Sequence, residues 1–214
     1  MTGLENDPDQ KAKEYAMCVI DPWWWLTGWA KTLDEHNRLE PLRQFPDKEY
    51  LRRLTYLFLT KSLLAIAKSR QMMISWLFCA LFLWDAAFHN GRRLIIQTKK
   101  ADDADALVKR CHFIWENMPD FLKRYPANPG RAGRHTYCRF GIPAANSEIM
   151  GLPAGSDQIR MYTASRVLED EFQLQEEGRE ILEAVQPTLT GGGGLILVGT
   201  AHPGFFEKLI HDSL

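Results

Sequence analysis

Short apolar segments separated by helical patterns are the feature that most limits what this chain of 214 residues can fold into. Three of them are apolar without alternation: Leu63–Ala67, Leu94–Gln97 and the run LILVG that begins at Leu195. Strands of this kind are buried on both faces, which is typical of parallel sheets covered by helices. Helical patterns lie between them, over about 72–88 and 101–118. The sequence therefore predicts an α/β fold with a mainly parallel sheet and helices on both faces.

The rest of the chain adds smaller elements to this core. We interpret residues 1–60 as an N-terminal helical arm and residues 61–214 as the core domain. Four tryptophans of the arm favour its packing onto the core, although such rings also stack on bases: Trp23, Trp24, Trp25 and Trp29. The segments HTYCRFG and SEIMGLP alternate enough to predict a small β-hairpin insertion, and Ile159–Tyr162 is interpreted as a further short strand.

Charge limits the possible partners. The formal net charge is −1, so a nucleic acid would have to bind a local basic patch. The candidate patch is the loop-like stretch 121–147, which contains no acidic residue. Within it, Arg131 and Arg134 are candidates for DNA or subunit contacts, and a solvated loop is the alternative. The most apolar stretch contains Asp85 and follows a charged turn, which favours a buried helix, so we expect no membrane partner.

A polar turn between the strand at 63–67 and the apolar helix carries the first chemical signal. The turn reads AKSRQMMIS from Ala67. A bound triphosphate needs backbone N–H groups, a helix N-terminus and at least one cation. Lys68 and Arg70 supply cations, and the Ser75 hydroxyl in the first helical turn can ligate Mg²⁺. A buried strand–turn–helix without chemistry is the alternative. The predicted nucleotide site comprises Lys68, Ser69, Arg70, Gln71, Met72, Met73, Ile74 and Ser75.

Two adjacent carboxylates provide the second signal. Asp170 and Glu171 follow an apolar strand end in RVLEDEF. Neighbouring residues there point in different directions, so Asp170 can hold Mg²⁺ while Glu171 activates the attacking water. A solvated acidic turn is the alternative. Both signals follow parallel strands, whose carboxyl ends share the edge of the sheet where ligands bind. Gly199, Thr200 and Ala201 end another strand, and small residues there can contact the γ-phosphate region.

In their order and spacing, these motifs resemble the ATPase domain of the large terminase subunit, the DNA-packaging motor of tailed phages. Ser69, Arg70, Gln71 and Ser75 match the family's phosphate loop, and the acid pair and the run LILVGTAHPG match its later motifs. The resemblance covers about residues 15–212. It implies a P-loop-type fold, ATP hydrolysis, and ATP and Mg²⁺ as cofactors. It also implies that the end of the segment 1–60 lies on the adenine side of the site, with Arg43, Phe45 and Tyr50 as candidate contacts.

The resemblance also implies roles and partners. Lys68 corresponds to the functional lysine that some family members carry at the start of the loop, Gly199-Thr200-Ala201 to the coupling motif, and Arg160 to an arginine that acts on the ATP of a neighbouring subunit. The implied partners are double-stranded DNA, a homo-oligomeric ring on a portal and the small terminase subunit. The implied location is the host cytoplasm and, transiently, the procapsid portal.

The loop departs from the family pattern at two positions. Met73 and Ile74 stand where the family has glycine and lysine. A non-catalytic interaction module with a loop that no longer binds nucleotide is therefore one alternative, and a helicase-like translocase is another. In complete large terminases a nuclease domain follows the ATPase domain. This sequence stops at Leu214, soon after the coupling motif, so we expect no nuclease domain and no DNA cleavage.

Overall fold

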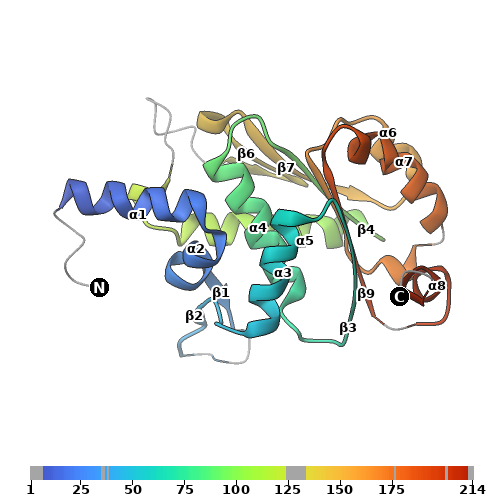
Figure 1. Ribbon diagram of the computed structural model, residues 1–214, viewed down its shortest axis with the longest axis horizontal. Coiled ribbons are helices and arrows are strands. Elements are labelled where there is room, and N and C mark those ends of the chain that lie inside the picture. Colours follow the sequence, from blue (N-terminus) through green and yellow to red (C-terminus); the bar gives the residue numbers. More distant parts are fainter. Residues whose placement is uncertain are drawn as a thin grey trace.

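The computed structural model describes residues 7–34, 37, 39–123, 134–175, 177–200 and 202–211. In this part of the chain a seven-stranded sheet carries helices on both faces, with a two-stranded sheet beside it (Figure 1). The helices are α1 (Pro8–Ile20), α2 (Pro22–Trp29), α3 (Glu49–Thr60), α4 (Ile74–Phe88), α5 (Ala101–Glu116), α6 (Ser156–Arg160), α7 (Gly178–Thr190) and α8 (Phe205–His211). The strands are β1 (Lys31–Leu33), β2 (Leu42–Gln44), β3 (Leu63–Lys68), β4 (Arg93–Thr98), β5 (Arg134–Thr136), β6 (Arg139–Ile142), β7 (Ser147–Pro153), β8 (Arg166–Glu169) and β9 (Gly194–Thr200). The predicted α/β fold class is confirmed.

The large sheet has the order β3-β9-β8-β4-β7-β6-β5. Strands β3, β9, β8, β4 and β7 run parallel, whereas β6 and β5 are antiparallel to their neighbours. The predicted hairpin forms between β6 and β7, and β7 also pairs with β4. The hairpin is therefore continuous with the central sheet. Helices α1 to α5 lie on one side of the sheet and α6 to α8 on the other (Figure 1).

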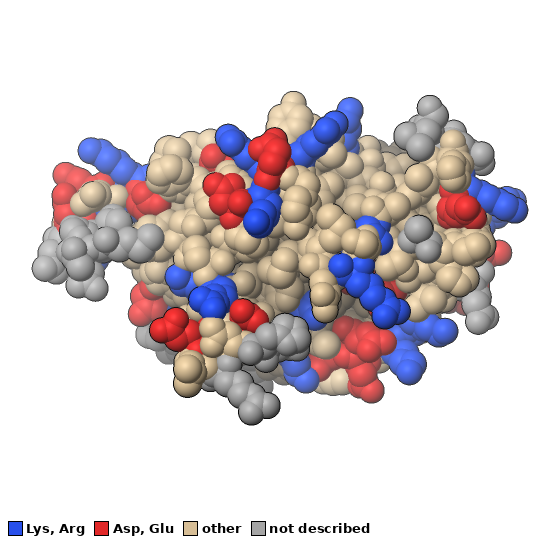
Figure 2. Space-filling model, turned by 90° about the horizontal axis from the view of Figure 1, so that it is seen from below, with Lys and Arg blue, Asp and Glu red and all other residues tan. Residues whose placement is uncertain are grey.

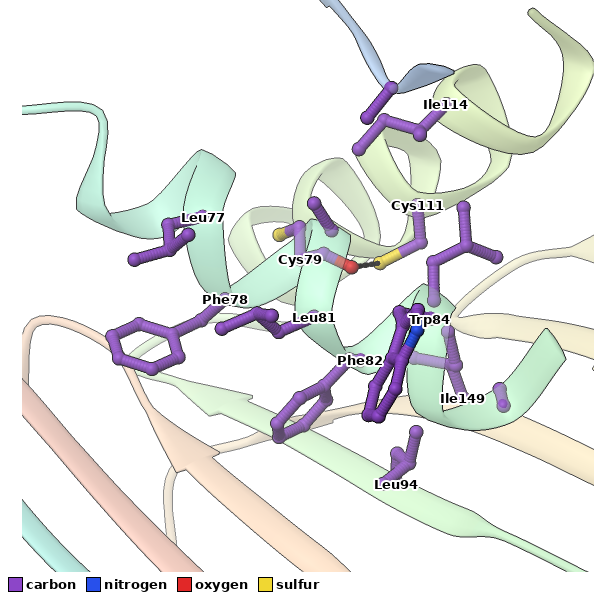
Figure 3. Close-up of a cluster of buried hydrophobic side chains, with 14 of the residues drawn as sticks. Leu77, Phe78, Cys79, Leu81, Phe82, Trp84, Leu94, Cys111, Ile114 and Ile149 are labelled. Atoms are coloured by element: carbon purple, nitrogen blue, oxygen red, sulfur yellow. Dashed lines mark hydrogen bonds between the residues drawn. The ribbon is translucent and has the colours of Figure 1, made fainter. Parts of the chain in front are cut away.

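Helix α4 is the centre of the larger hydrophobic core. All of its residues except Ser75 and Trp76 are buried, which is typical of a helix surrounded by protein. Figure 3 shows α4 between α5, which contributes Cys111 and Ile114, and the sheet, which contributes Leu94 and Ile149. The Cys111 thiol donates a hydrogen bond to the carbonyl oxygen of Cys79 across 3.3 Å. This packing fixes the helix whose first turn faces the predicted nucleotide site.

The N-terminal arm packs onto this core, as its tryptophans predict. Trp25 is completely buried, and Trp23 and Trp29 pack against the same core cluster. The indole nitrogens of Trp24 and Trp29 both donate hydrogen bonds to one carboxylate oxygen of Glu14, at 2.6 and 2.7 Å. The packing interpretation is confirmed for Trp23, Trp25 and Trp29, whereas the Trp24 ring is 47% exposed. Among the described residues, no helix combines the length and apolar character needed to cross a bilayer.

The prediction of a short strand over Ile159–Tyr162 is wrong. The segment forms the end of α6 and the turn after it. Gly155, with φ at 131°, redirects the chain after β7, and one helical turn then places Ile159 in the smaller core on the other face of the sheet. Asp157 and Arg160 pair on the exposed side of this turn. Burial of a single apolar side chain suits a helical turn better than a two-sided buried strand.

A buried carboxylate near the end of α4, that of Asp85, pairs with two arginines. Asp85 accepts hydrogen bonds from Nε and Nη2 of Arg92, at 2.9 and 2.8 Å, and lies 3.5 Å from Nε of Arg166. The guanidinium of Arg166 stacks over the Phe58 ring, 4.1 Å from its centroid. Burial alone would raise the pKa of Asp85, but His89, whose Nδ1 lies 3.3 Å from Oδ1, the hydrogen bonds from Arg92 and the arginine charges outweigh it and lower that pKa.

Candidate nucleotide-binding site

Ser75 and Asp170 come together although 95 residues separate them in the sequence. Ser75 lies in the first turn of α4, and Asp170 directly follows β8. The Ser75 hydroxyl donates a hydrogen bond to Oδ2 of Asp170 at 2.7 Å, and the Glu171 backbone N–H donates to Oδ1 at 3.0 Å. Asp170 is only 5% exposed. A hydroxyl and a carboxylate side by side at a helix N-terminus form a donor set that suits Mg²⁺ bound to phosphates.

The loop between β3 and α4 adopts a left-handed conformation without glycine. Gln71 has φ at 61° and Met73 has φ at 58°. For a residue with a Cβ atom, such a conformation costs about 1–2 kcal/mol. Met72 and Met73 pack against the large core, and Ile74 is 4% exposed. Burial of these side chains offsets the backbone cost, so the loop takes the turn that a glycine would usually provide.

A cavity of about 600 Å³ lies over this loop. This volume is within the range of small-molecule sites. On one side its lining comes from the loop and the first turn of α4: Lys68, Gln71, Met72, Met73, Ile74, Ser75 and Trp76. On the other side it comes from the two-stranded sheet, the loop after it and α5: Thr32, Leu33, Asp34, Arg43, Gln44, Pro46 and Arg110. The structure thus brings Lys68 to the cavity, whereas Ser69 and Arg70 are exposed and do not line it.

The wall opposite the loop includes Gln44, which is not among the residues that the sequence singles out. Gln44 donates hydrogen bonds to the carbonyl oxygens of Thr27 and Ala30, at 2.8 and 3.1 Å, and accepts one from Lys31 at 2.6 Å. It therefore holds β2 against the end of α2. Tyr50 donates to the carbonyl oxygen of Met72 at 3.2 Å and so tethers the loop. The role of these residues depends on contacts between distant segments.

The predicted coupling segment at the end of β9 lies next to the strand that leads into the loop, β3. Thr200 is the register partner of Lys68, and its backbone N–H donates to Oε1 of Gln173 at 3.0 Å. Gly199 has no room for a side chain, because a Cβ atom would lie 2.5 Å from the Phe206 ring and 2.7 Å from the same Gln173 oxygen. The segment after the acid pair is thereby attached to Thr200. Ala201 lies outside the described residues.

The remaining candidate residues lie at the surface or outside the described chain. Glu171 is exposed and has φ at 55°, directly after Asp170. Arg160 ends α6, where its half-exposed side chain lies 3.5 Å from Asp157. Arg131 lies outside the described residues, and of Arg134 only the backbone, in β5, is described. In the view of Figure 2, basic and acidic side chains are interspersed around a largely uncharged centre.

Glu169 precedes Asp170 but belongs to the opposite face of the sheet. Val167, two residues earlier, packs in the smaller core, whereas Leu168 packs in the core of α4. Because side chains alternate along a strand, Glu169 shares the face of Val167 and Asp170 that of Leu168. Glu169 is completely buried, and neither carboxyl oxygen has a hydrogen-bond partner among the described residues. Burial raises the pKa of Glu169 well above its ordinary value.

Replacement of Glu169 by methionine is expected to raise the free energy of unfolding by about 1–3 kcal/mol at pH 8, the penalty of an unsatisfied buried polar group. The pKa of Glu169 is raised in the folded state. Its contribution to the free energy of unfolding is therefore fully present below its ordinary pKa of 4.5 and is lost as the pH rises through the folded pKa. The gain should therefore be larger at pH 8 than at pH 5. Urea unfolding of both proteins measures it, with exposed Glu183→Met as the control. Equal stability of wild type and Glu169→Met at pH 8 would contradict this assignment.

Comparison with known proteins identifies the fold. No family model matches the sequence, and no curated protein does. The large terminase ATPase domain of Thermus phage P74-26 is similar in structure, with a TM-score of 0.63 at 16% identity over 77% of this chain and 69% of that chain. The large terminase of bacteriophage HK97 has a TM-score of 0.64 at 10% identity over 93% of this chain, which spans only 40% of that protein. The resemblance to large terminase ATPase domains is thus confirmed at the level of the fold.

Proposed function

We propose that this chain is the ATPase motor domain of a phage large terminase subunit, which hydrolyses ATP to move double-stranded DNA into a procapsid. The contact between Ser75 and Asp170 carries the proposal, because it places two oxygen ligands next to the cavity that Lys68 lines. The fold shared with solved large terminases supports it. The reaction belongs in the host cytoplasm, on a homo-oligomeric ring at the portal, with the small terminase subunit as a further partner.

Each residue of the site has a distinct part in hydrolysis. Lys68 would bind the phosphates from the end of β3, and Ser75 and Asp170 would hold Mg²⁺, which would supply positive charge against the phosphates. Glu171 orients the attacking water and accepts its proton. The exposed position of Glu171 at the end of β8 leaves it accessible to water beside the metal ligands.

Other residues would link hydrolysis to movement. The Thr200 backbone is bound by Gln173, three residues after Asp170, so a change at the acid pair reaches the end of β9 directly. Arg160 is at the surface, which suits an arginine that acts on the ATP of a neighbouring subunit in the ring. Such arginines accelerate phosphoryl transfer by about 10³–10⁵-fold. A lone subunit should therefore be a weak ATPase.

Replacement of Lys68 by alanine tests the nucleotide site. We expect the dissociation constant for Mg·ATP to rise about 10- to 100-fold, because a charge-assisted contact to phosphate contributes about 1.5–3 kcal/mol. Isothermal titration calorimetry measures this constant, and phosphate release by assembled rings with DNA measures turnover. Lys61→Ala, an exposed lysine just before β3, is the matched control and should bind as the wild type does. Absence of Mg·ATP binding by the wild type would favour a non-catalytic interaction module instead.

A further inference from the structure

Besides Lys68, the cavity is lined by two cations that lie outside the loop, Arg43 of β2 and Arg110 of α5. They differ in their partners. Arg43 lies 3.6 Å from the Asp34 carboxylate, which lines the same cavity. The Arg110 side chain has no ion pair or hydrogen bond with any of the described residues, although Lys109, the residue before it, pairs with Asp105 at 2.7 Å. Arg110 therefore brings an uncompensated positive charge to the cavity.

An aromatic ring holds the Arg110 guanidinium in place. Its Cζ atom lies 5.2 Å from the ring centroid of Trp76, the residue that follows Ser75 in α4. The Trp76 ring in turn packs edge-on against Phe113, with ring centroids 6.0 Å apart at 74°. Arg110 and Phe113 are three residues apart on α5, so they share one face of that helix. Ring and guanidinium thus support each other across the α4–α5 contact.

Stacking on a ring leaves the donors of an arginine free. The guanidinium has five N–H donors in its plane, and a cation–π contact uses the face of that plane and none of these donors. They can still bind oxygens in the bidentate manner that suits phosphate. Arg110 is half-buried, which reduces the screening of its charge by water. It has both the charge and the geometry of an anion ligand.

The loop itself supplies too little positive charge. A nucleoside triphosphate carries about four negative charges, and a bound Mg²⁺ compensates about half of them. Where a phosphate loop commonly has its lysine, Ile74 is buried in the core, and Arg70 does not line the cavity. Lys68 is thus the loop's cation at the cavity. Negative charge therefore remains at the site, and Arg110 is placed to compensate part of it.

We infer that Arg110 binds the phosphate chain of the nucleotide held by its own subunit, as the second phosphate-binding cation of the site. The inference rests on the proposed function, since it concerns the same nucleotide. The second cation thus comes from α5, outside the loop, because Ile74 stands where a phosphate loop commonly has its lysine. Trp76 also has a role, which is to position the guanidinium beside the first turn of α4.

Calorimetric titration of the full chain with Mg·ATP and with inorganic tripolyphosphate tests this inference. In Arg110→Gln, both dissociation constants should rise by about tenfold or more, because a charged hydrogen bond to phosphate is lost. Arg110→Lys should lie between this variant and the wild type, since lysine keeps the charge without the bidentate fork. Lys109→Gln removes the same charge one residue away, from a side chain that pairs with Asp105 and does not line the cavity, and should bind both ligands within about twofold of the wild type, because water screens its exposed charge.

The outcomes separate this inference from the proposed function. Unchanged Mg·ATP affinity in Arg110→Gln would overturn the role of Arg110, and so would a loss confined to ATP, because tripolyphosphate lacks a base. If the wild type binds Mg·ATP but rings with DNA do not hydrolyse it, the motor proposal fails, whereas a tenfold loss in Arg110→Gln still supports Arg110. If the wild type binds neither ligand, both proposals fail. Unchanged thermal unfolding of Arg110→Gln shows that the variant is folded.

Discussion

Replacement of Glu171 by glutamine is expected to slow ATP hydrolysis by about 10²–10⁴-fold, which is the contribution of a positioned general base. The affinity for Mg·ATP should stay close to that of the wild type, because Asp170 and not Glu171 contacts Ser75. Glutamine keeps the size of the side chain but cannot accept the proton of the attacking water. Phosphate release by assembled rings in the presence of DNA measures the rate, and calorimetry measures the affinity.

The control for this prediction is Glu183→Gln. Glu183 is exposed on α7, so its replacement removes the same charge at a distance from the acid pair and should leave the rate unchanged. Wild-type turnover by Glu171→Gln rings would show that another group activates the water. A fall in Mg·ATP affinity equal to the fall in rate would instead make Glu171 a ligand of the metal or the nucleotide.

Replacement of Asp85 by asparagine is expected to lower the free energy of unfolding by about 3–5 kcal/mol at pH 7, the effect of removing one partner of a buried ion pair. The variant leaves Arg92 without its bidentate acceptor, and it leaves the charge of Arg166 uncompensated beside Phe58. Urea unfolding followed by circular dichroism measures the loss. The exposed Asp103→Asn serves as the control, and surface substitutions of this kind change stability by about 0.5 kcal/mol.

The stability difference between wild type and Asp85→Asn should depend on pH. Asp85 has a lowered pKa in the folded state, so its contribution to stability is fully present above its ordinary pKa of 3.8 and is lost as the pH falls through the folded value. The difference between wild type and Asp85→Asn should therefore shrink below pH 3.8. A difference that stays constant from pH 7 to this range would show that packing of the side chain, and not its charge, stabilises the fold.

The sequence predicts most of the parallel sheet, for a physical reason. Leu63–Ala67 and Leu94–Gln97 are continuous apolar runs, and their length decides for a strand. The burial on both faces that such runs predict holds for β4, whereas β3 is an edge strand in which exposed and buried positions alternate. The strands β3 and β4 include these residues. Ile159–Tyr162 misleads because a short run with one core residue fits a single helical turn equally well. The order of strands follows from tertiary packing and cannot be obtained from such local patterns.

The candidate site likewise contains residues that the sequence predicts and residues that it does not. Lys68, Ser75 and Asp170 stand out in the sequence because each ends a strand or begins a helix, and the structure brings Ser75 and Asp170 into contact. Arg110 gives no such signal, because in the sequence it is one charged residue on the polar side of an amphipathic helix. Only the packing of α5 against α4 turns it toward the cavity.

The order of the sheet has a mechanical consequence. Strand β3, which bears Lys68, pairs among the described strands with β9 alone, and β9 separates it from β8, which leads to Asp170. Neighbouring strands are about 4.8 Å apart, so the lysine and the carboxylate stand on strands about 10 Å apart with Thr200 on the strand between them. Because β9 is hydrogen-bonded to both outer strands, a displacement of one of them reaches the other through β9. Thr200 therefore ends the strand that lies between the two groups we propose to bind the phosphates and the metal.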